Sequence, residues 1–464
     1  MSRPPTSSRR DFLRASLLTS AVFGAEPALA QNATRASSEN SGRPRNVIFM
    51  VSDGMNCGAL SLAKLYGGLV LEKQNHWMQL YRERAVVRCL AETYSANSVV
   101  TDSAAASSAW GGGQRVNNGT LNISAADGSP ITPLQAKLKE RKIRTGLVTT
   151  ATITHATPAG FAVNVSSRGD EKEIAQQYLD RRVDVLLGGG RKFFSPELLA
   201  QYTAAGYEFA DSRTALQGLN HSSAKPMLGL FADGYHPFEI DRENVPEITA
   251  AMPTLAEMAR AALERLSPSP DGFFLLVEGA RIDHAGHAND AAASIHEQLA
   301  FDQAIGTVLE FIASHPDTLL IITTDHGCGG IQMNGVSADA KQGFLPGLYN
   351  ATTPSFLKLK NFTRSMEWMK QVKIDGLSGP KLGEALTQYT GLTFSGDQIK
   401  ALQGLKLPAT SDVLKEHHGV GWTSANHTSE LVEFCALGPG SHLFSPYLWN
   451  YEVHNLILRA LEIA

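Results

Sequence analysis

The chain has 464 residues, of which 43% are hydrophobic and 19% are charged, and its formal net charge at neutral pH is −4. This weakly acidic composition excludes the strongly basic surface that nucleic acids bind, so we expect no nucleic-acid partner. The length and the hydrophobic share indicate a large folded core instead.

The first 30 residues have the order of an export signal. Arg9 and Arg10 precede a mildly apolar stretch over 15–25, and the sequence Ala-Leu-Ala follows at 28–30. The paired arginines are typical of the twin-arginine route, and the alternative is an amphipathic helix at the N-terminus. We expect a periplasmic or secreted protein that begins near Gln31. The loss of four arginines and two acidic residues then changes its formal charge from −4 to about −6.

Residues 31–464 are predicted to form one large domain, because no linker rich in Pro, Ser or Gly divides them. Apolar runs alternate with helical stretches over 171–179, 253–266 and 291–312. This alternation favours an α/β fold with a mainly parallel central sheet and helices on both faces. Apart from the signal, no run reaches the roughly 18 apolar residues of a membrane-spanning helix, so we expect no membrane anchor.

Residues 329–419 interrupt this alternation. They contain scattered aromatic residues and Gly-Pro breaks, with modest helical stretches over 380–389 and 396–402. Sequence typical of a strand resumes over 430–437. We interpret the segment as an inserted lid or crown.

Four apolar runs each lead into side chains that bind metals. Run 46–51 precedes Asp53, 147–150 precedes His155, 273–277 precedes Glu278, and 318–323 precedes Asp325 and His326. The carboxyl ends of parallel strands meet at one edge of a sheet, where ligands bind in α/β folds. A cation satisfies buried carboxylate and imidazole groups together, and zinc accepts that mixture. The sequence therefore predicts a metal centre at this edge, although an isolated Asp-Gly such as that at Asp53 is more typical of a turn.

Two further segments extend the predicted centre. Asp283 and His287 are four residues apart, so on a helix they share a face and can hold one cation; the alternative is a solvated surface pair. Ser103 follows Asp102 and precedes three alanines, which predicts a hydroxyl at the start of a helix. An Asp-Ser pair is by itself a common helix start, but a nearby divalent cation activates such a hydroxyl as a nucleophile.

Together these segments resemble the alkaline phosphatase family over nearly the whole chain after the signal. The resemblance is carried by residues 52–55, 100–105, 155–159, 183–190, 277–279, 283–284 with His287, 324–326 and 427–428. Single matches are weak, but their order and spacing are specific to the family. The resemblance implies a three-layer α/β sandwich that hydrolyses small phosphate monoesters through a phosphoserine intermediate, with an alkaline pH optimum. It also implies a homodimer as the default assembly.

The resemblance further implies two Zn²⁺ ions and one Mg²⁺ ion. In the family the first zinc binds the leaving-group oxygen and then the attacking water, and the second zinc activates the serine. The matching residues are Asp283, His287 and His427 for the first zinc, Asp53, Ser103, Asp325 and His326 for the second, and His155, Thr157 and Glu278, with Asp53 shared, for magnesium.

Arg168 resembles the family arginine that grips two phosphoryl oxygens, a task that suits a planar guanidinium. Asp102 is the second residue expected to bind substrate. Without the resemblance, an arginine in such a polar loop is more typical of a surface charge.

Histidines near the expected ligands leave two questions open, namely which histidine completes the first zinc site and how the third metal is held. His417 and His418 are nearby rivals of His427. His284 stands where some family members have Lys, and some have Asp at the position of His155. Histidine at both positions suggests a third metal that is held differently and an optimum further into the alkaline range.

Two alternative functions stay open. One is a phosphodiesterase or sulfatase of the same superfamily, although the sequence around Ser103 lacks the C/S-x-P-x-R setting of sulfatases. The other is a protein that binds metal or phosphate without turnover, which has little use for Ser103 and Arg168 beside the ligands. The natural substrate and the metal in each site are not specified by the sequence.

The four cysteines, Cys57, Cys89, Cys328 and Cys435, contain no C-x-x-C pair, and their spacing leaves any disulfide pairing open. Cys57 and Cys328 lie close in sequence to Asp53 and His326. Because the expected ligand set is complete without thiolates, neither cysteine is expected to bind a metal.

Overall fold

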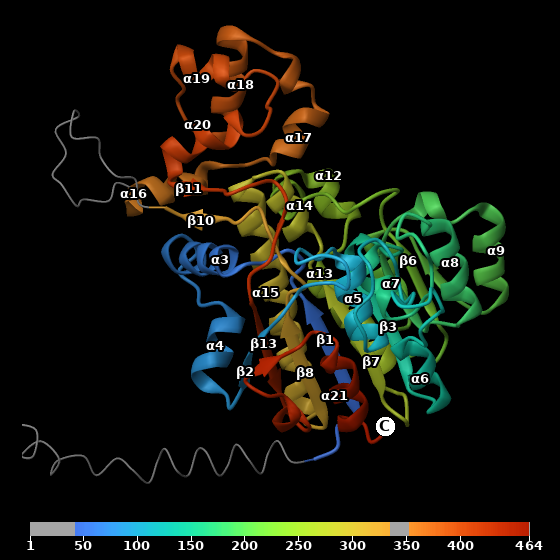
Figure 1. Cartoon of the computed structure of the whole chain (residues 1–464). Helices are drawn as coiled ribbons and strands as arrows, with labels where there is room; N and C mark the ends of the chain where they lie inside the picture. The colour runs from blue at the N-terminus through green and yellow to red at the C-terminus, as the bar shows by residue number, and fades with distance from the viewer. Residues whose placement is uncertain (1–41, 335–351, 464) are drawn as a thin grey trace, which may run out of the picture.

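The computed structural model of the chain describes residues 42–334 and 352–463. The predicted signal over 1–30 and part of the predicted insertion lie outside these residues. A ten-stranded sheet, in the order β14-β2-β13-β8-β1-β7-β3-β4-β6-β5, forms the centre of the molecule (Figure 1). Its strands are β1 (Asn46–Val51), β2 (Val87–Ala91), β3 (Arg144–Thr152), β4 (Val185–Gly189), β5 (Glu208–Ala210), β6 (Met227–Leu230), β7 (Phe273–Glu278), β8 (Thr318–Thr323), β13 (Val432–Leu437) and β14 (Tyr447–Leu448).

The sheet is mainly parallel, as the sequence predicts. β1 pairs in parallel with β7 on one side and with β8 on the other. From β7 the sheet continues in parallel through β3, β4 and β6 to β5. Only β13 reverses the direction, since it pairs antiparallel with both β8 and β2 among the described strands of this sheet.

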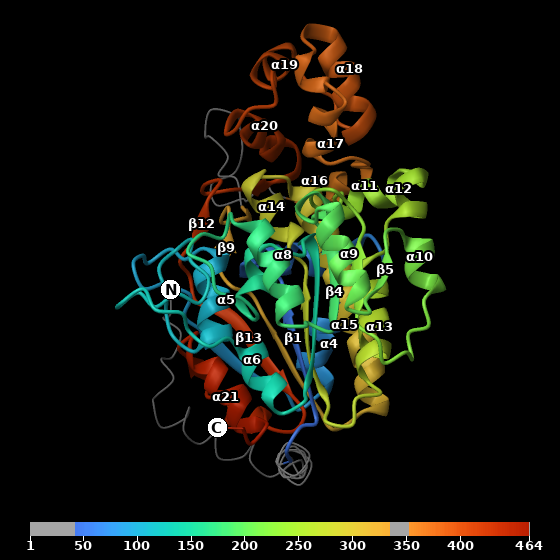
Figure 2. The ribbon, with the colours of Figure 1, turned by 90° about the vertical axis from the view of Figure 1, so that its right-hand side faces the viewer.

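The side chains of β1 alternate between two apolar cores. Val47, Phe49 and Val51 belong to one core, Ile48 and Met50 belong to the other, and all five are fully buried. Parallel strands that are covered on both faces need such continuous apolar sequence. Figure 2 shows the sheet between its two layers of helices, which confirms the three-layer fold. The first face is covered by α5 (Ser103–Gly112), α6 (Leu134–Glu140), α8 (Glu171–Asp180), α9 (Pro196–Ala204) and α21 (Glu452–Ala460), and the second by α3 (Cys57–Leu69), α4 (His76–Glu83), α13 (Leu255–Leu266) and α15 (Ala291–Ser314).

The three helices expected from the sequence are α8, α13 and α15, and local hydrogen bonds explain where two of them begin. The Thr254 side chain accepts a hydrogen bond from the Glu257 backbone, and the Glu257 side chain accepts one from the Thr254 backbone, which forms a capping box before α13. Asp290 caps α15 by accepting a hydrogen bond from the backbone of Ala293.

Residues 352–418, here called the cap, form small helices beyond the carboxyl edge of the sheet (Figure 1). Two buried carboxylates hold the cap to the body. Asp241 accepts hydrogen bonds from the backbone and the hydroxyl of Ser365, at 2.8 and 2.5 Å, and Asp290 accepts one from the backbone of Met366 at 2.7 Å. The cap helices are α16 (Thr353–Phe356), α17 (Met366–Gln371), α18 (Gly379–Thr390), α19 (Gly396–Ala401) and α20 (Ala409–His418), of which α18 and α19 match the two expected helical stretches.

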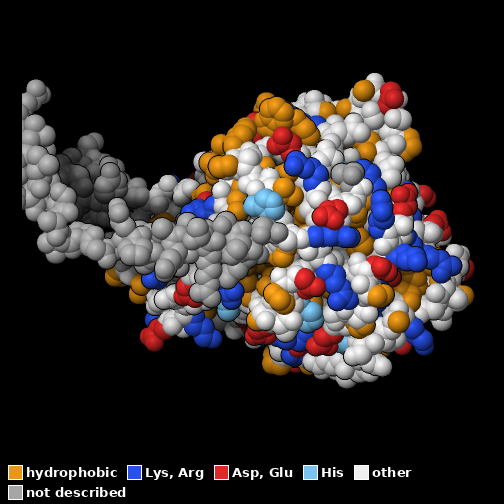
Figure 3. Space-filling model, turned by 90° about the horizontal axis from the view of Figure 1, so that it is seen from below, with side chains coloured by type: hydrophobic (Ala, Val, Ile, Leu, Met, Phe, Trp, Pro, Cys, Tyr) orange, Lys and Arg blue, Asp and Glu red, His pale blue; other side chains and the backbone are white. Residues whose placement is uncertain are grey.

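The opposite end of the molecule has a mixed charge. Figure 3 shows this end from below, with acidic and basic side chains interspersed over the coloured atoms. At the amino ends of β1, β3 and β7, a cavity of about 460 Å³ is lined by Arg43, Arg45 and Arg141 together with Asp271 and Glu462. In the described part of the chain, none of the helices combines the length and the apolar character needed to cross a membrane.

Candidate active site

Four neighbouring strands deliver the candidate ligands to the carboxyl edge of the sheet. β8, β1, β7 and β3 are adjacent. Asp325 and His326 follow β8, Asp53 follows β1, Glu278 ends β7, and His155 lies three residues beyond β3. The structure therefore brings these side chains to one edge. Side chains that could hold a metal form three groups, and within each group the potential donor atoms all lie within 4.8 Å of one another. The first group is Asp283, His287, Cys328 and His427, the second is Asp53, Asp325 and His326, and the third is Asp53, His155 and Glu278.

The first group joins α14 (Arg281–His287) to the short strand β12 (His427–Thr428). Nε2 of His287 lies 3.1 Å from Nε2 of His427, and these nitrogens lie 3.3 and 3.5 Å from the two carboxylate oxygens of Asp283. Nδ1 of each histidine faces a backbone carbonyl, of Ala425 and of Thr101 respectively. Such bonds fix the rings with Nε2 directed at a common point, as in metal sites. The hydrogen bond with Asp283 raises the pKa of His287 to about 9.

The rival histidines lie elsewhere. His418 is buried within the cap, where its Nδ1 accepts a hydrogen bond from the backbone of Val420 and its ring lies against Phe362. His417 lies against Phe394 of the cap. Of the three histidines, only His427 meets Asp283.

The second group consists of buried side chains around the Ser103 hydroxyl. Nε2 of His326 lies 3.0 Å from Oδ2 of Asp325 and 3.9 Å from Oδ1 of Asp53. Oγ of Ser103 lies 3.3 Å from the same nitrogen. Burial, followed by the negative charges of Asp325 and Asp283, raises the pKa of Asp53 well above its ordinary range. Asp53 is thus disfavoured in its ionised form until a cation is present.

The third group lies beside the second and shares Asp53. Glu278 is fully buried, and one of its oxygens accepts a hydrogen bond from the Thr149 hydroxyl at 2.5 Å. Burial raises the pKa of Glu278 to about 7. Thr157 lies on α7 (Ala156–Gly160), and its hydroxyl is buried without a hydrogen-bond partner. Burial lowers the pKa of His155, which favours the neutral imidazole that binds metals.

Gly54 allows the turn after β1 to approach α14 closely. Its φ of 73° lies in the left-handed region, and a Cβ there would lie 2.6 Å from Cα of Asp283. Its backbone N–H donates to Oδ1 of Asp325 at 3.1 Å. The Asp-Gly sequence is therefore a turn and also part of the site, so the two interpretations of Asp53 do not exclude each other.

Ser103 is the first residue of α5, as the sequence predicts. Asp102 caps the helix, since its carboxylate accepts a hydrogen bond from the backbone of Ala105 at 2.9 Å. The nine residues from Ser103 to Gly111 are buried, because small side chains let α5 pack closely on α7. The N-terminus of a helix attracts anions through its free N–H groups and its dipole. The N-terminus of α5 therefore contributes favourably to the binding of a phosphate ester at Ser103.

Arg168 lies beside the nucleophile candidate. Its Nη1 donates to Oδ2 of Asp102 at 3.1 Å, and its Nη2 lies 3.0 Å from Nε2 of His155. The side chain of Arg168 is 29% exposed, so the guanidinium is oriented by its neighbours and still reaches solvent. Arg168 is therefore not a free surface charge, which was the alternative interpretation of its sequence.

His284 contacts neighbours of the site but belongs to none of the three groups. The centre of its ring lies 4.4 Å from that of Tyr235, with the two rings tilted by 37°, and 5.8 Å from that of His155. Nη1 of Arg281 lies 2.8 Å from its Nδ1. Burial and the positive charge of Arg281 lower the pKa of His284 to about 3, so this histidine is neutral.

Cys328 is the group member that sequence reasoning set aside. All four cysteines have free thiols, and Cys57 alone of them is exposed. Cys328 lies on β9 (Gly327–Cys328), which pairs with β12, and it is 1% exposed. Its position two residues after His326 was the available signal, but its contact with Asp283 depends on a long-range pairing.

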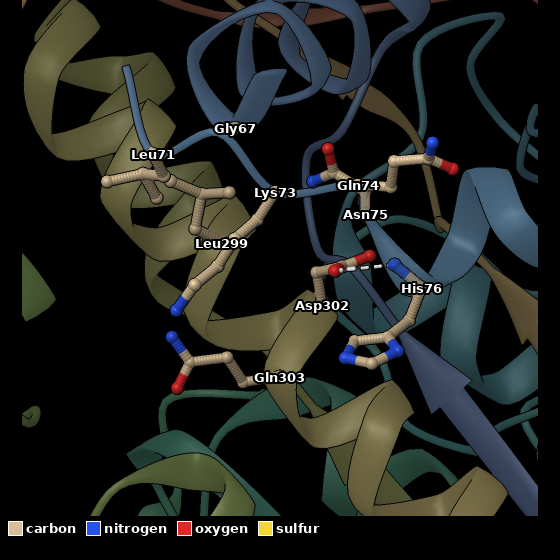
Figure 4. A pocket seen from close by; sticks show the side chains of 9 residues that line it. All are labelled: Gly67, Leu71, Lys73, Gln74, Asn75, His76, Leu299, Asp302 and Gln303. Atoms are coloured by element: carbon tan, nitrogen blue, oxygen red, sulfur yellow. Dashed lines mark hydrogen bonds between the residues drawn. The ribbon is translucent and has the colours of Figure 1, made fainter. Parts of the chain in front are cut away.

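A separate cavity of about 300 Å³ lies between α3, α4 and α15, and Figure 4 shows the residues that line it. Asp302 of α15 accepts hydrogen bonds from the backbone of His76 and Trp77, at 2.8 and 3.0 Å. These bonds serve the start of α4, where the Asn75 side chain makes no cap bond. The cavity shares no lining residue with the three groups, and we interpret it as a helix junction.

Polar atoms left without partners test whether metals fit the three groups. Buried atoms without a hydrogen-bond partner are both carboxylate oxygens of Asp53, Oδ2 of Asp325, Oε1 of Glu278, Oδ1 of Asp283, Oγ1 of Thr157 and Nδ1 of His155. Such atoms are costly to bury unless something binds them. Carboxylate and imidazole donors suit zinc, and carboxylate and hydroxyl oxygens suit magnesium. The residues present therefore fit bound divalent cations.

Comparisons with known proteins agree with this geometry. The family model described as alkaline phosphatase matches residues 44–463. The chain belongs to the alkaline phosphatase family. It is 29% identical to alkaline phosphatase 4 of Bacillus subtilis, over 96% of this chain and 95% of that protein. It is 32% identical to the repressible alkaline phosphatase of Saccharomyces cerevisiae, over 89% and 78% of the two chains.

Solved structures lead to the same family. The alkaline phosphatase of Thermus thermophilus is 31% identical with a TM-score of 0.81, and the match covers 92% of this chain and 94% of that one. The cold-active enzyme of a Shewanella species is 30% identical with a TM-score of 0.76, over 90% and 99% of the two chains. This alkaline phosphatase family member is thus a metal-dependent phosphomonoesterase, which confirms the expectation from the sequence.

Proposed function

We propose that Ser103 is the nucleophile of this phosphomonoesterase and that turnover proceeds through a phosphoserine at this position. The observation that carries the proposal is the position of its hydroxyl. Oγ lies at the N-terminus of α5 and 3.3 Å from Nε2 of His326, among buried carboxylates and imidazoles that lack partners. An unassisted serine hydroxyl is a weak nucleophile. The N-terminus of α5, together with the cations that these groups would hold, would lower the free energy of its ionised form.

We assign two zinc ions and one magnesium ion to the three groups. When bound, such ions act as Lewis acids that lower the pKa of a serine hydroxyl or a water and stabilise negative charge on phosphoryl and leaving oxygens. Mixed carboxylate and imidazole donors support zinc in the first two groups, and a hydroxyl with two carboxylates supports magnesium in the third. The residues are Asp283, His287 and His427 for one zinc, Asp53, Ser103, Asp325 and His326 for the other, and Asp53, His155, Thr157 and Glu278 for magnesium.

The chain's own residues bind and orient the phosphoryl group. Arg168 donates two parallel N–H groups to phosphoryl oxygens, and Asp102 orients Arg168 through the contact at 3.1 Å. Oγ of Ser103 forms a bond to phosphorus while the bond to the leaving oxygen breaks, and the alcohol departs. Water then forms a bond to the same phosphorus while the Oγ–P bond breaks, which releases inorganic phosphate and restores the serine.

The remaining proposals concern the context of the enzyme and rest on the sequence. We propose export by the twin-arginine signal over 1–30 to the periplasm or the medium. The catalytic domain then spans 31–464, with an insertion over about 329–419 that includes the cap. A homodimer and an alkaline optimum complete the proposal.

The experiment that tests the function compares phosphate release from a nitrophenyl monoester and from the matching diester. The protein is loaded with zinc and magnesium and assayed from neutral to strongly alkaline pH. We expect a large monoester preference that rises with pH and disappears on chelation. Preferential hydrolysis of the diester would instead favour a phosphodiesterase, and turnover that survives thorough chelation would exclude the metal assignment.

A further inference from the structure

Cys328 carries a buried thiol that the proposed mechanism does not use. Cys89 and Cys435, the other buried cysteines, each belong to one of the two apolar cores, whereas Cys328 belongs to neither core in the described residues. Apolar packing therefore does not explain the position of Cys328, and the polar neighbours of its thiol have to be considered.

The strand pairing directs Cys328 towards the first group. β9 and β12 are antiparallel, and Cys328 is the direct partner of His427. Directly opposed residues of an antiparallel pair present their side chains on the same face. The Cys328 sulfur accordingly lies within 4.8 Å of the donor atoms of Asp283, His287 and His427. It also lies against α14 at Gly286, where a Cβ would be only 2.9 Å from the sulfur.

One carboxylate oxygen of Asp283 lacks a hydrogen-bond donor. Its side chain is 4% exposed, and its Oδ1 has no hydrogen-bond partner. The two histidine nitrogens face its oxygens, but their ring positions are fixed by bonds to backbone carbonyls. The thiol of Cys328 is a third polar neighbour of this carboxylate, since its sulfur lies within 4.8 Å of an Asp283 oxygen. A ligand carboxylate is held in place by such an outer neighbour.

The thiol has two conceivable roles, and the chemistry decides between them. If the sulfur bound the metal, four protein donors would close a tetrahedral site. A zinc that serves turnover keeps one position open for substrate or water. We infer that Cys328 is a positioning residue, whose S–H donates to the Asp283 carboxylate and holds it in the ligating orientation, and that it does not bind the zinc. This inference rests on the proposed function, which requires the open position.

The test measures metal affinity and needs no turnover. Zinc binding by the full-length protein is measured against a competing chelator for the wild type and for Cys328→Ala, Cys328→Ser and the control Cys89→Ala. We expect Cys328→Ala to bind its weakest zinc about 10–100-fold less tightly. Cys328→Ser retains a donor and is expected to stay close to the wild type. Cys89→Ala removes a buried sulfur from an apolar core and is expected to leave zinc affinity unchanged.

Cobalt adds a spectroscopic readout on the wild-type protein. A thiolate bound to Co²⁺ gives an intense charge-transfer absorption in the near ultraviolet, and we expect none that depends on Cys328. Such a band, present in the wild type and absent in Cys328→Ala, would overturn the inference, as would equal losses of affinity in the Ala and Ser variants or unchanged affinity in both. If the affinities behave as expected and the cobalt spectrum shows no thiolate band while the monoester is not hydrolysed, the proposed function fails and the positioning role then stands on the metal-binding data alone.

Discussion

At the scale of single residues, a substitution of Arg168 can separate the contribution of its charge to substrate binding from that of its planar geometry. Its guanidinium lies between Asp102 and His155, with contacts of 3.1 and 3.0 Å. Arg168→Lys keeps the positive charge but loses the planar pair of donors. We expect kcat/KM for a monoester to fall roughly tenfold to hundredfold, because bidentate contacts to the phosphoryl group are lost. Steady-state kinetics at fixed metal content measure the effect.

Arg191→Lys is the matched control for this substitution. Arg191 forms a partly exposed ion pair with Asp211 at 3.7 Å, and neither residue belongs to the three metal groups. We expect its kinetics to equal those of the wild type. Equal kcat/KM in Arg168→Lys and the wild type would remove Arg168 from substrate binding.

The site residues also show which features of the site can be predicted from the sequence. Four predicted ligands lie at the ends of strands that are adjacent in the sheet, so their convergence follows from the fold alone; they are Asp53, Glu278, Asp325 and His326. Their assignment to individual ions remains a prediction. The position of Cys328 beside Asp283 could not be foreseen from the sequence. It depends on the pairing of β9 with β12, which lie about a hundred residues apart in the chain.

Among secondary-structure elements, α14 and the cap helix α17 are joined by one ion pair. Arg281 of α14 donates to both carboxylate oxygens of Glu367, at 2.8 and 2.9 Å, and its side chain is 2% exposed. Glu367→Gln leaves this buried guanidinium without its countercharge. We expect the free energy of unfolding to fall by about 1–3 kcal/mol, as measured by urea denaturation.

The pair of Arg260 and Glu310 provides the control, since both side chains are more than half exposed. Glu310→Gln is expected to change the free energy of unfolding by about 0.5 kcal/mol or less. A similar small change in Glu367→Gln would mean that this pair does not hold the cap to α14.

The elements themselves were predictable to different degrees. β1 and β8 have the bounds expected from the sequence, because central parallel strands that are buried on both faces form continuous apolar runs. β3 extends to Arg144–Thr152, well beyond the expected run over 147–150, since polar threonines continue it. The short edge strands β5 and β14 were not foreseen, because two or three residues carry too little pattern.

For the whole molecule, one buried carboxylic acid links stability to pH. Glu297 of α15 is 3% exposed, and burial raises its pKa from the ordinary 4.5 to about 8. The folded protein therefore holds this proton more tightly than the unfolded chain does. The stabilising contribution is complete below about pH 4.5 and is lost as the pH rises through about 8.

Glu297→Gln removes this dependence while keeping an acceptor for the backbone N–H of Glu239. We expect the variant to gain stability relative to the wild type between pH 5 and pH 9, by on the order of 3 kcal/mol. Denaturant titrations at several pH values measure the difference. A difference in stability that does not change with pH would show that Glu297 is ionised throughout this range.

The central claim is that the Ser103 hydroxyl is the nucleophile of a metal-dependent phosphomonoesterase. The most direct test measures phosphate release from a nitrophenyl monoester by the wild type and by Ser103→Ala, each loaded with zinc and magnesium and assayed at the same alkaline pH. We predict that Ser103→Ala loses turnover about a thousandfold or more while its binding of metal and of inorganic phosphate persists. Turnover by Ser103→Ala equal to that of the wild type, at equal metal content, would contradict the claim.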